Sequence, residues 1–299
     1  MHSFFKVIIA TVLVSLSHLP PASSADVYKY RDEQGNWVFT DKKPTAAAAT
    51  EILRYENDTK EKIEPKIYIT ANNHIKVINP LYIPIEIKFR DGNNKLFYHA
   101  TIAEKSTQII YRGGEENTNY SYSYSWLQGN PDASHADSYY QIPFKSSFKR
   151  KITQAFNGQF SHYSLDNQHA VDIALPVGTP ITAARAGIVI YTKDDYIFSG
   201  QSTYFLDKAN KVEVLHDDGT YAVYAHLLQS TIGVTIGDSV AVGAELGKSG
   251  SSGFSTGPHL HFVIRRNIGF KTVSVPFRFS DNNANPFTPT AGYYIQPNR

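Results

Sequence analysis

Residues 257–264 read Gly-Pro-His-Leu-His-Phe-Val-Ile and predict a β-strand that presents two histidines on one face. Successive side chains of a strand point to opposite faces, so His259 and His261 project together while Leu260 faces away. Exposed histidine pairs also occur without any bound ligand. The pair therefore indicates a metal site only if other parts of the chain supply matching residues.

Two further residues of this half of the chain stand out. Asp172 lies in the apolar stretch 170–176, where an ionised carboxylate is unfavourable unless it is paired or bound to a metal. A solvated strand end is the alternative for Asp172. His226 ends a predicted strand, which pairs with residues 211–216 through an Asp-Asp-Gly turn. Taken alone, His226 is more typical of a structural histidine than of a catalytic one.

The order of these features resembles the LytM and lysostaphin type of zinc endopeptidase, a family of bacterial cell-wall hydrolases. The resemblance covers most of residues 141–266 and is carried by Asp172 followed by six motifs. They are Pro-Val-Gly-Thr-Pro at 176–180, Ala-Ala-Arg-Ala-Gly-Ile-Val at 183–189, Tyr-Ala-His-Leu at 224–227, Ile-Gly-Asp-Ser-Val at 236–240, Leu-Gly-Lys-Ser-Gly at 246–250 and Gly-Pro-His-Leu-His-Phe at 257–262. It implies an antiparallel β-sheet catalytic domain, one zinc ion per chain and peptidoglycan as the substrate.

The resemblance also implies roles for individual residues. Asp172 and His261 match zinc ligands of the family, and His226 and His259 match the histidines that stay off the metal and transfer protons. The family's first ligand lies four residues before the aspartate, but that position here is Gln168. His162 and His169 compete for the role. On a continuous strand His169 would point away from the face of Asp172, so we favour His162, which can reach the site across a loop.

The rest of the chain divides into smaller units. An apolar run at 7–16 and small residues at 22–25 predict a signal peptide, and the run is too short for the alternative of a permanent membrane anchor. Residues 27–41 predict a hairpin that resembles a small module of unknown function in exported Gram-negative proteins. Residues 46–62 are polar and predict a linker, and alternating apolar residues further on predict an antiparallel β-sandwich.

We therefore predict a mainly β, multi-domain protein in four parts. They are a signal peptide (1–25), a small module with a linker (26–64), a β-sandwich-like domain (65–139) and a zinc metallopeptidase domain with a C-terminal tail (140–299). The sandwich could block the catalytic groove, bind the wall or bind a wall-associated protein, and the sequence leaves these roles open, as it does the oligomeric state.

Composition limits the functions to consider. The chain has no cysteine, so a metal must be held by histidine and carboxylate. Its formal charge of +2, without a long basic block, gives no support to nucleic-acid binding. We expect an exported zinc endopeptidase, periplasmic or else secreted. The alternative is a catalytically silent regulator that binds a cell-wall amidase or the wall. A sugar-cleaving enzyme needs a pair of carboxylates, and none stands out.

Overall fold

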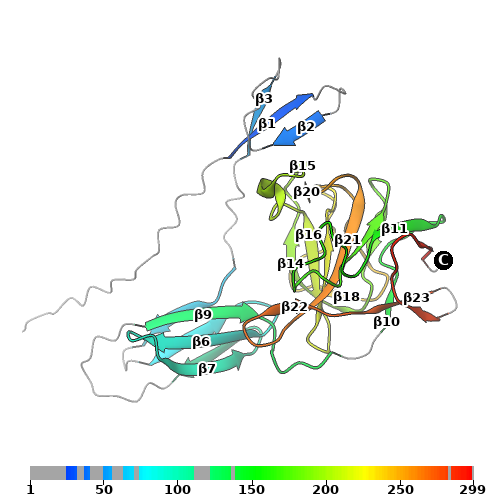
Figure 1. The fold of residues 1–299 in the computed structure, drawn as a ribbon. Coiled ribbons are helices and arrows are strands. Elements are labelled where there is room, and N and C mark those ends of the chain that lie inside the picture. Colours follow the sequence, from blue (N-terminus) through cyan, green and yellow to red (C-terminus); the bar gives the residue numbers. More distant parts are fainter. Residues whose placement is uncertain are drawn as a thin grey trace, which may run out of the picture.

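The structure is a computed structural model, and it describes residues 25–31, 37–40, 50–55, 63–70, 74–110, 122–135, 139–281 and 284–297. Within these ranges the chain forms β-strands and one short 3-10 helix, η1 (Thr203–Phe205). The predicted mainly β fold is confirmed (Figure 1). The predicted signal peptide lies outside the described residues, apart from Ala25. No helix in the described ranges has the length and apolar character needed to cross a bilayer.

The N-terminal module is a three-stranded antiparallel sheet. The predicted hairpin is confirmed, since Tyr28 pairs with Thr40 across its strands. The linker interpretation of residues 46–62 is wrong for residues 51–55, which form a third strand on the other edge of the first. In a two-stranded hairpin the outer edge of residues 25–31 would be unpaired, and the third strand satisfies the backbone hydrogen-bonding groups of that edge. In order across the sheet the strands are β2 (Trp37–Thr40), β1 (Ala25–Arg31) and β3 (Glu51–Tyr55).

The expected β-sandwich consists of two three-stranded antiparallel sheets that share one apolar core. Alternate residues such as Ile75, Val77, Ile85, Ile87 and Phe89 point inward and are fully buried. One sheet contains β4 (Lys66–Ile69), β5 (Ile75–Asn79) and β8 (Ser106–Ile110). The other contains β7 (Leu96–Ile102), β6 (Ile85–Asp91) and β9 (Tyr122–Gln128).

A nine-stranded antiparallel sheet forms the centre of the C-terminal part. The predicted hairpin around Gly219 is confirmed as β16 and β17, and Gly219 has a φ of 79°, which favours glycine. In order across the sheet the strands are β18 (Ser239–Val240), β14 (Gly187–Lys193), β16 (Lys211–Leu215), β17 (Tyr221–Ala225), β21 (His259–Asn267), β12 (Val171–Ala174), β11 (Arg150–Gln154) and β25 (Tyr294–Ile295), with β22 (Thr272–Ser274) also paired to β21.

Shorter strands surround this sheet. They are β13 (Pro180–Thr182) with β19 (Glu245–Lys248), β15 (Ser199–Gly200) with β20 (Gly253–Phe254), and the group β10 (Tyr139–Gln141), β23 (Arg278–Ser280) and β24 (Pro286–Phe287). The sheet of the N-terminal module lies near β15, which β2 approaches (Figure 1).

The two faces of the large sheet are covered differently. Leu260, Phe262 and Ile264 of β21 point into the main core. On the opposite face Val263 packs with Ile83, from the loop between β5 and β6 of the sandwich. The sandwich therefore covers one end of the face that His259 and His261 share, and leaves the histidine end to other elements.

A buried carboxylate joins the sandwich to the far end of β21. Glu86 is 1% exposed and accepts hydrogen bonds from the side-chain amide of Asn267 at 2.8 Å and from the backbone N–H of Phe270 at 2.6 Å. The ring of His99 lies 2.7 Å from the other carboxylate oxygen. Burial raises the pKa of Glu86, but these hydrogen bonds outweigh it and lower the pKa. An ionised, fully hydrogen-bonded carboxylate thus connects β6 to the strand of the histidine pair.

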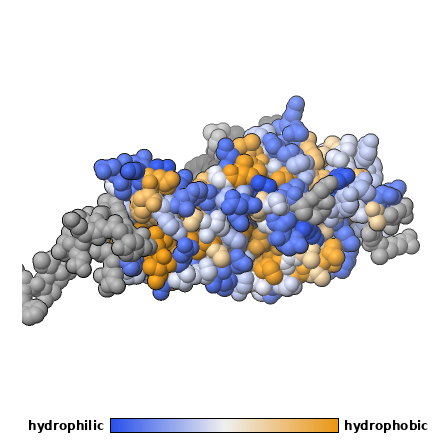
Figure 2. All heavy atoms as spheres, turned by 90° about the horizontal axis from the view of Figure 1, so that it is seen from below, coloured by the Kyte–Doolittle hydropathy of each residue, from blue (hydrophilic) through white to orange (hydrophobic). Residues whose placement is uncertain are grey.

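The exposed surface is mixed. On the face seen in Figure 2, hydrophobic patches alternate with hydrophilic residues. Exposed apolar side chains such as Tyr68 and Ile109 are scattered over the strands of the sandwich. Isolated exposed apolar residues are normal on protein surfaces.

His216, at the end of β16, makes the stability of this fold dependent on pH. Its side chain is buried, and Nδ1 donates a hydrogen bond to the carbonyl of Ala186 at 2.9 Å. Burial lowers the pKa of His216 to about 4, although the hydrogen bond to Ala186 favours the charged ring.

Because the unfolded chain binds a proton near pH 6.5 and the folded chain only near pH 4, His216 makes the fold less stable as the pH falls between these values. Asparagine can keep the bond to Ala186 but does not titrate. We therefore expect the free energy of unfolding of the wild type to fall by about 3 kcal/mol more than that of His216→Asn between pH 7 and pH 4. Urea unfolding followed by circular dichroism measures the difference. Equal losses in both proteins would contradict this account.

Candidate metal centre

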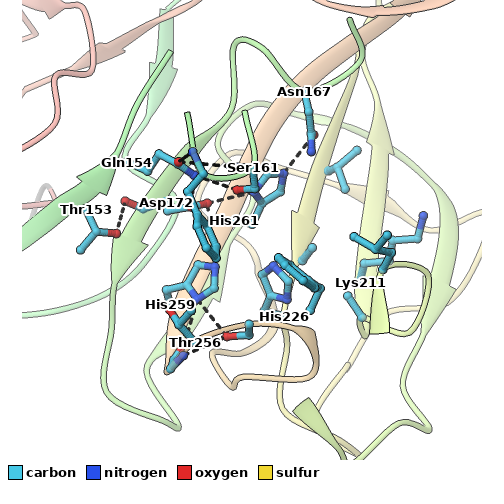
Figure 3. Close-up of a pocket in the computed structure, with 18 of the residues that line it drawn as sticks. Thr153, Gln154, Ser161, Asn167, Asp172, Lys211, His226, Thr256, His259 and His261 are labelled. Carbon is cyan, nitrogen blue, oxygen red and sulfur yellow. Dashed lines mark hydrogen bonds and ion pairs between the residues drawn. The ribbon is translucent and has the colours of Figure 1, made fainter. Parts of the chain in front are cut away.

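The fold brings all five residues predicted for the site to one end of the large sheet. In the antiparallel register Asp172 on β12 lies opposite His261 on β21, and Ala225 at the end of β17 lies on the other side of His261. His226 follows directly after β17, and His162 comes from the loop between β11 and β12. Figure 3 shows Asp172, His226, His259 and His261 at one pocket, a cleft of about 800 Å³.

Three of these side chains converge on one point. Oδ1 of Asp172 lies 3.2 Å from Nε2 of His162 and 2.9 Å from Nδ1 of His261. The three ligand atoms all lie within 4.8 Å of one another, and the three residues are buried. This is the spacing expected of side chains that could share a metal ion.

The hydrogen bonds on the far sides of the rings show that a cation fits between them. Nδ1 of His162 lies 3.0 Å from the carbonyl of Ala155, which only accepts, so Nδ1 carries the proton of a neutral ring. Nε2 of His261 likewise faces the amide oxygen of Asn167 at 3.2 Å. The remaining nitrogen lone pairs of both rings therefore face a carboxylate oxygen. Three acceptors directed at one another require a proton or a cation between them, and a metal ion meets this requirement.

Asp172 is held in its ionised form. Burial raises the pKa of its carboxyl, but the interactions of Oδ1 with the imidazoles of His162 and His261 outweigh burial and hold the pKa well below its usual range. Its second oxygen accepts a hydrogen bond from the side-chain amide of Gln154 at 2.9 Å. A buried ionised carboxylate beside two imidazoles provides a donor set of the type that binds zinc.

His226 and His259 lie beside this group without joining it. Nδ1 of His259 donates to the carbonyl of Gly257 at 2.8 Å, and Nδ1 of His226 donates to the carbonyl of Ser252 at 2.7 Å, so each ring keeps Nε2 as an acceptor. The two ring centroids are 4.4 Å apart. Nε2 of His259 lies 3.9 Å from Asp172.

His226 is held in an unusual conformation. Burial, together with the charges of His259 and His261, lowers its pKa to about 3, so the ring is neutral at pH 7. Its φ of 64° lies in the left-handed region, which residues other than glycine rarely adopt. Such conformations are concentrated at functional sites, where surrounding hydrogen bonds impose them.

His169 lies away from the convergent group. Its Nδ1 lies 3.0 Å from the carbonyl of Ser274, and its ring packs edge-on against Phe156 with centroids 5.4 Å apart. The two histidines that compete for the first position therefore have different surroundings, and His162 is the one placed beside Asp172 and His261.

Four other polar residues complete the surroundings of the site, and sequence reasoning missed them. Gln154 bonds to Asp172 and to the hydroxyl of Ser161, and Asn167 bonds to His261 and Arg265. These residue types are common and the residues are separated along the chain, so no sequence motif pointed to them. Two loops line the cleft, through Leu206, Asp207 and Ala209 on one side and residues 254–258 on the other.

Two strands and a loop bring two histidines and an aspartate together beside one cleft, with two further histidines next to them. Such a group is a candidate metal site of the kind found in metal-dependent hydrolases. Residues 166–273 match the model of peptidase family M23, so the C-terminal part of this chain is similar to that family. The predicted resemblance to LytM and lysostaphin is thereby confirmed. The match begins after His162, consistent with the unusual position of that histidine. Residues 14–64 match a domain of unknown function, DUF4124.

Known proteins are similar to the same part of the chain. Glycyl-glycine endopeptidase ALE-1 of Staphylococcus capitis is 34% identical over 131 residues, which are 42% of this chain and 30% of that protein. Peptidoglycan DD-endopeptidase ShyA of Vibrio cholerae is 31% identical over 115 residues, which are 38% of this chain and 24% of that protein. The chain spans about a third or less of the length of these curated relatives.

Among solved structures, a mutant catalytic domain of the prophage-encoded M23 protein EnpA from Enterococcus faecalis is 30% identical. The similarity covers 45% of this chain and 92% of that domain, with a TM-score of 0.34.

The different surroundings of His162 and His169 lead to a test by metal content. We expect His162→Ala to lose the bound metal, because one of three converging lone pairs is removed, and we expect His169→Ala to keep it. Inductively coupled plasma mass spectrometry of the purified variants measures the metal per chain. Full metal retention in His162→Ala, with loss in His169→Ala, would reverse the assignment.

Proposed function

We propose that this protein is an exported zinc endopeptidase that hydrolyses peptide cross-links of bacterial peptidoglycan. The observation that carries the proposal is the convergence of Nε2 of His162, Oδ1 of Asp172 and Nδ1 of His261, two of which line an open cleft beside His226 and His259. The similarity of the C-terminal domain to proteins named as peptidoglycan endopeptidases supports the choice of substrate.

Zinc suits the residues present. Two imidazoles and one carboxylate are the donors that this cysteine-free chain offers, and three protein ligands are typical of catalytic zinc, which keeps a fourth position for water. When bound, the ion lowers the pKa of water to about 7 and polarises the carbonyl of the substrate. His162, Asp172 and His261 would hold one ion per chain. Gln154 fixes the carboxylate by bonding its second oxygen.

His226 and His259 would move protons during the reaction. With Nδ1 of each ring bonded to a backbone carbonyl, Nε2 is left to accept a proton from the attacking water and to return it to the leaving amine. These bonds to Ser252 and Gly257 also fix the orientation of the rings, so both face the space next to Asp172.

The cleft fits an extended peptide better than a bulky substrate. Its floor contains the small or β-branched side chains of Ala174, Val223 and Ala225, and its walls are loops. Tyr163 and Leu206 line it and are 75% and 63% exposed, so they are available for apolar contact with a bound chain. Cross-linking peptides of the cell wall have short side chains and an extended backbone, which such a cleft could hold.

Localisation and bond choice follow from the N-terminal sequence. The apolar run at residues 7–16 and the small residues at 22–25 support export, and together with the N-terminal module they favour the periplasm over secretion from the cell. We infer that the bond cut joins D-alanine to a diamino acid rather than lying within a glycine bridge. The alternative of a silent regulator is not favoured, because such relatives typically lack the metal ligands, and here the three residues converge.

Digestion of purified peptidoglycan sacculi tests this function. We expect cross-linked dimers to be split into two products whose masses together equal the dimer plus one water. A zinc chelator should abolish the reaction, and added zinc should restore it. Mass spectrometry of the fragments identifies the bond that is cut.

The same assay tests the two free histidines. We expect His226→Ala and His259→Ala each to lower turnover by roughly 10²- to 10⁴-fold, the usual contribution of general acid–base catalysis, while one zinc stays bound. His74→Ala, in the sandwich, serves as the matched control and should keep full activity. Intact cross-links after incubation with the zinc-loaded wild type would contradict the proposal and favour the regulator.

A further inference from the structure

The imidazole of His261 has a hydrogen-bonding partner on each side. Nδ1 lies 2.9 Å from Asp172, and Nε2 lies 3.2 Å from Oδ1 of Asn167. A neutral imidazole has one proton, and the nitrogen without it is the one that can bind a metal. The group that faces Nε2 therefore decides whether Nδ1 is available to the ion.

The amide of Asn167 is oriented by a second donor. Nη2 of Arg265 lies 2.9 Å from the same Oδ1. A guanidinium group only donates hydrogen bonds, so the oxygen and not the nitrogen of the amide must face Arg265 and His261. With its oxygen in that place, Asn167 accepts a hydrogen bond from the Nε2–H of His261, so the proton of the neutral ring stays on Nε2 and Nδ1 carries none.

Arg265 is itself fixed. It follows His261 by four residues on β21, so both side chains lie on the same face of the strand. Its Nε donates to the carbonyl of Asp166 at 2.7 Å, and its Nη2 lies 3.1 Å from the carboxylate of Asp166. The side chain is 18% exposed. A guanidinium with three oxygen partners has little freedom to release the amide.

One loop contributes to both histidine ligands of the site. The segment between β11 and β12 carries His162, and five residues later it carries Asn167. Backbone hydrogen bonds hold Asn167 in place, with its N–H bonded to Ser164 and its carbonyl to the N–H of Ala170, both at 2.9 Å. The loop thus supplies one ligand directly and the orienting partner of another.

We propose that Asn167 is a positioning residue of the metal centre, which keeps the proton of His261 on Nε2 and so directs Nδ1 toward the ion, while Arg265 fixes the amide. Asn167 acts through His261 and does not bind the metal. This inference rests on the zinc site proposed above.

The affinity of the purified full-length protein for zinc tests the inference, measured by competition with a chromophoric chelator. Asn167→Leu removes the acceptor, and we expect the dissociation constant for zinc to rise roughly 10- to 100-fold, the usual effect of losing such a partner. Asn167→Asp keeps an acceptor and should bind zinc at least as tightly as the wild type. Gln168→Ala changes the neighbouring side chain of the same loop and should leave the affinity unchanged.

A second measurement needs no variant. In the zinc-loaded wild type, long-range 1H–15N NMR correlations should show the proton of His261 on Nε2. A proton on Nδ1 would overturn the inference, even if Asn167→Leu did not fold. Wild-type affinity in a folded Asn167→Leu would overturn it as well, and would leave the proposed function intact. A wild type that binds no zinc would overturn both.

Discussion

The structure of the site depends on keeping an ionised carboxylate buried. Asp172 is only 8% exposed, and a charge in such a place is unfavourable unless other groups compensate for it. The compensation comes from two imidazoles, 2.9 and 3.2 Å from Oδ1, and from the amide of Gln154 on the other oxygen. Both rings bond their other nitrogen to an oxygen acceptor, so a proton or a cation is needed between the rings and Oδ1 to complete the compensation.

The large sheet places these groups by its register. Three neighbouring strands, β12, β21 and β17, bring Asp172, His261 and Ala225 into one row, and His226 follows at the end of β17. The alternation along β21 sends Leu260 and Phe262 into the core and both histidines to the cleft. The sandwich packs against the far end of the same strand through Ile83 and Glu86. The large sheet is therefore supported from both faces.

The sequence was most informative where the relevant physics is local. The alternation of a strand predicted that His259 and His261 share a face, and the unfavourable position of a charge in an apolar run identified Asp172. Pairings between distant segments were harder to predict. Residues 51–55 looked like a linker because nothing near them shows the free edge of β1 that they cover. Asn167 and Arg265 gave no signal because each becomes informative only through its contact with the other and with His261.

The coordination of zinc in the loaded protein tests the central claim most directly. A crystal structure with anomalous scattering at the zinc edge should show one ion bound by Nε2 of His162, Oδ1 of Asp172 and Nδ1 of His261, with a non-protein oxygen in the fourth position. An ion bound by His226 or His259, or one enclosed by four protein ligands, would contradict the account.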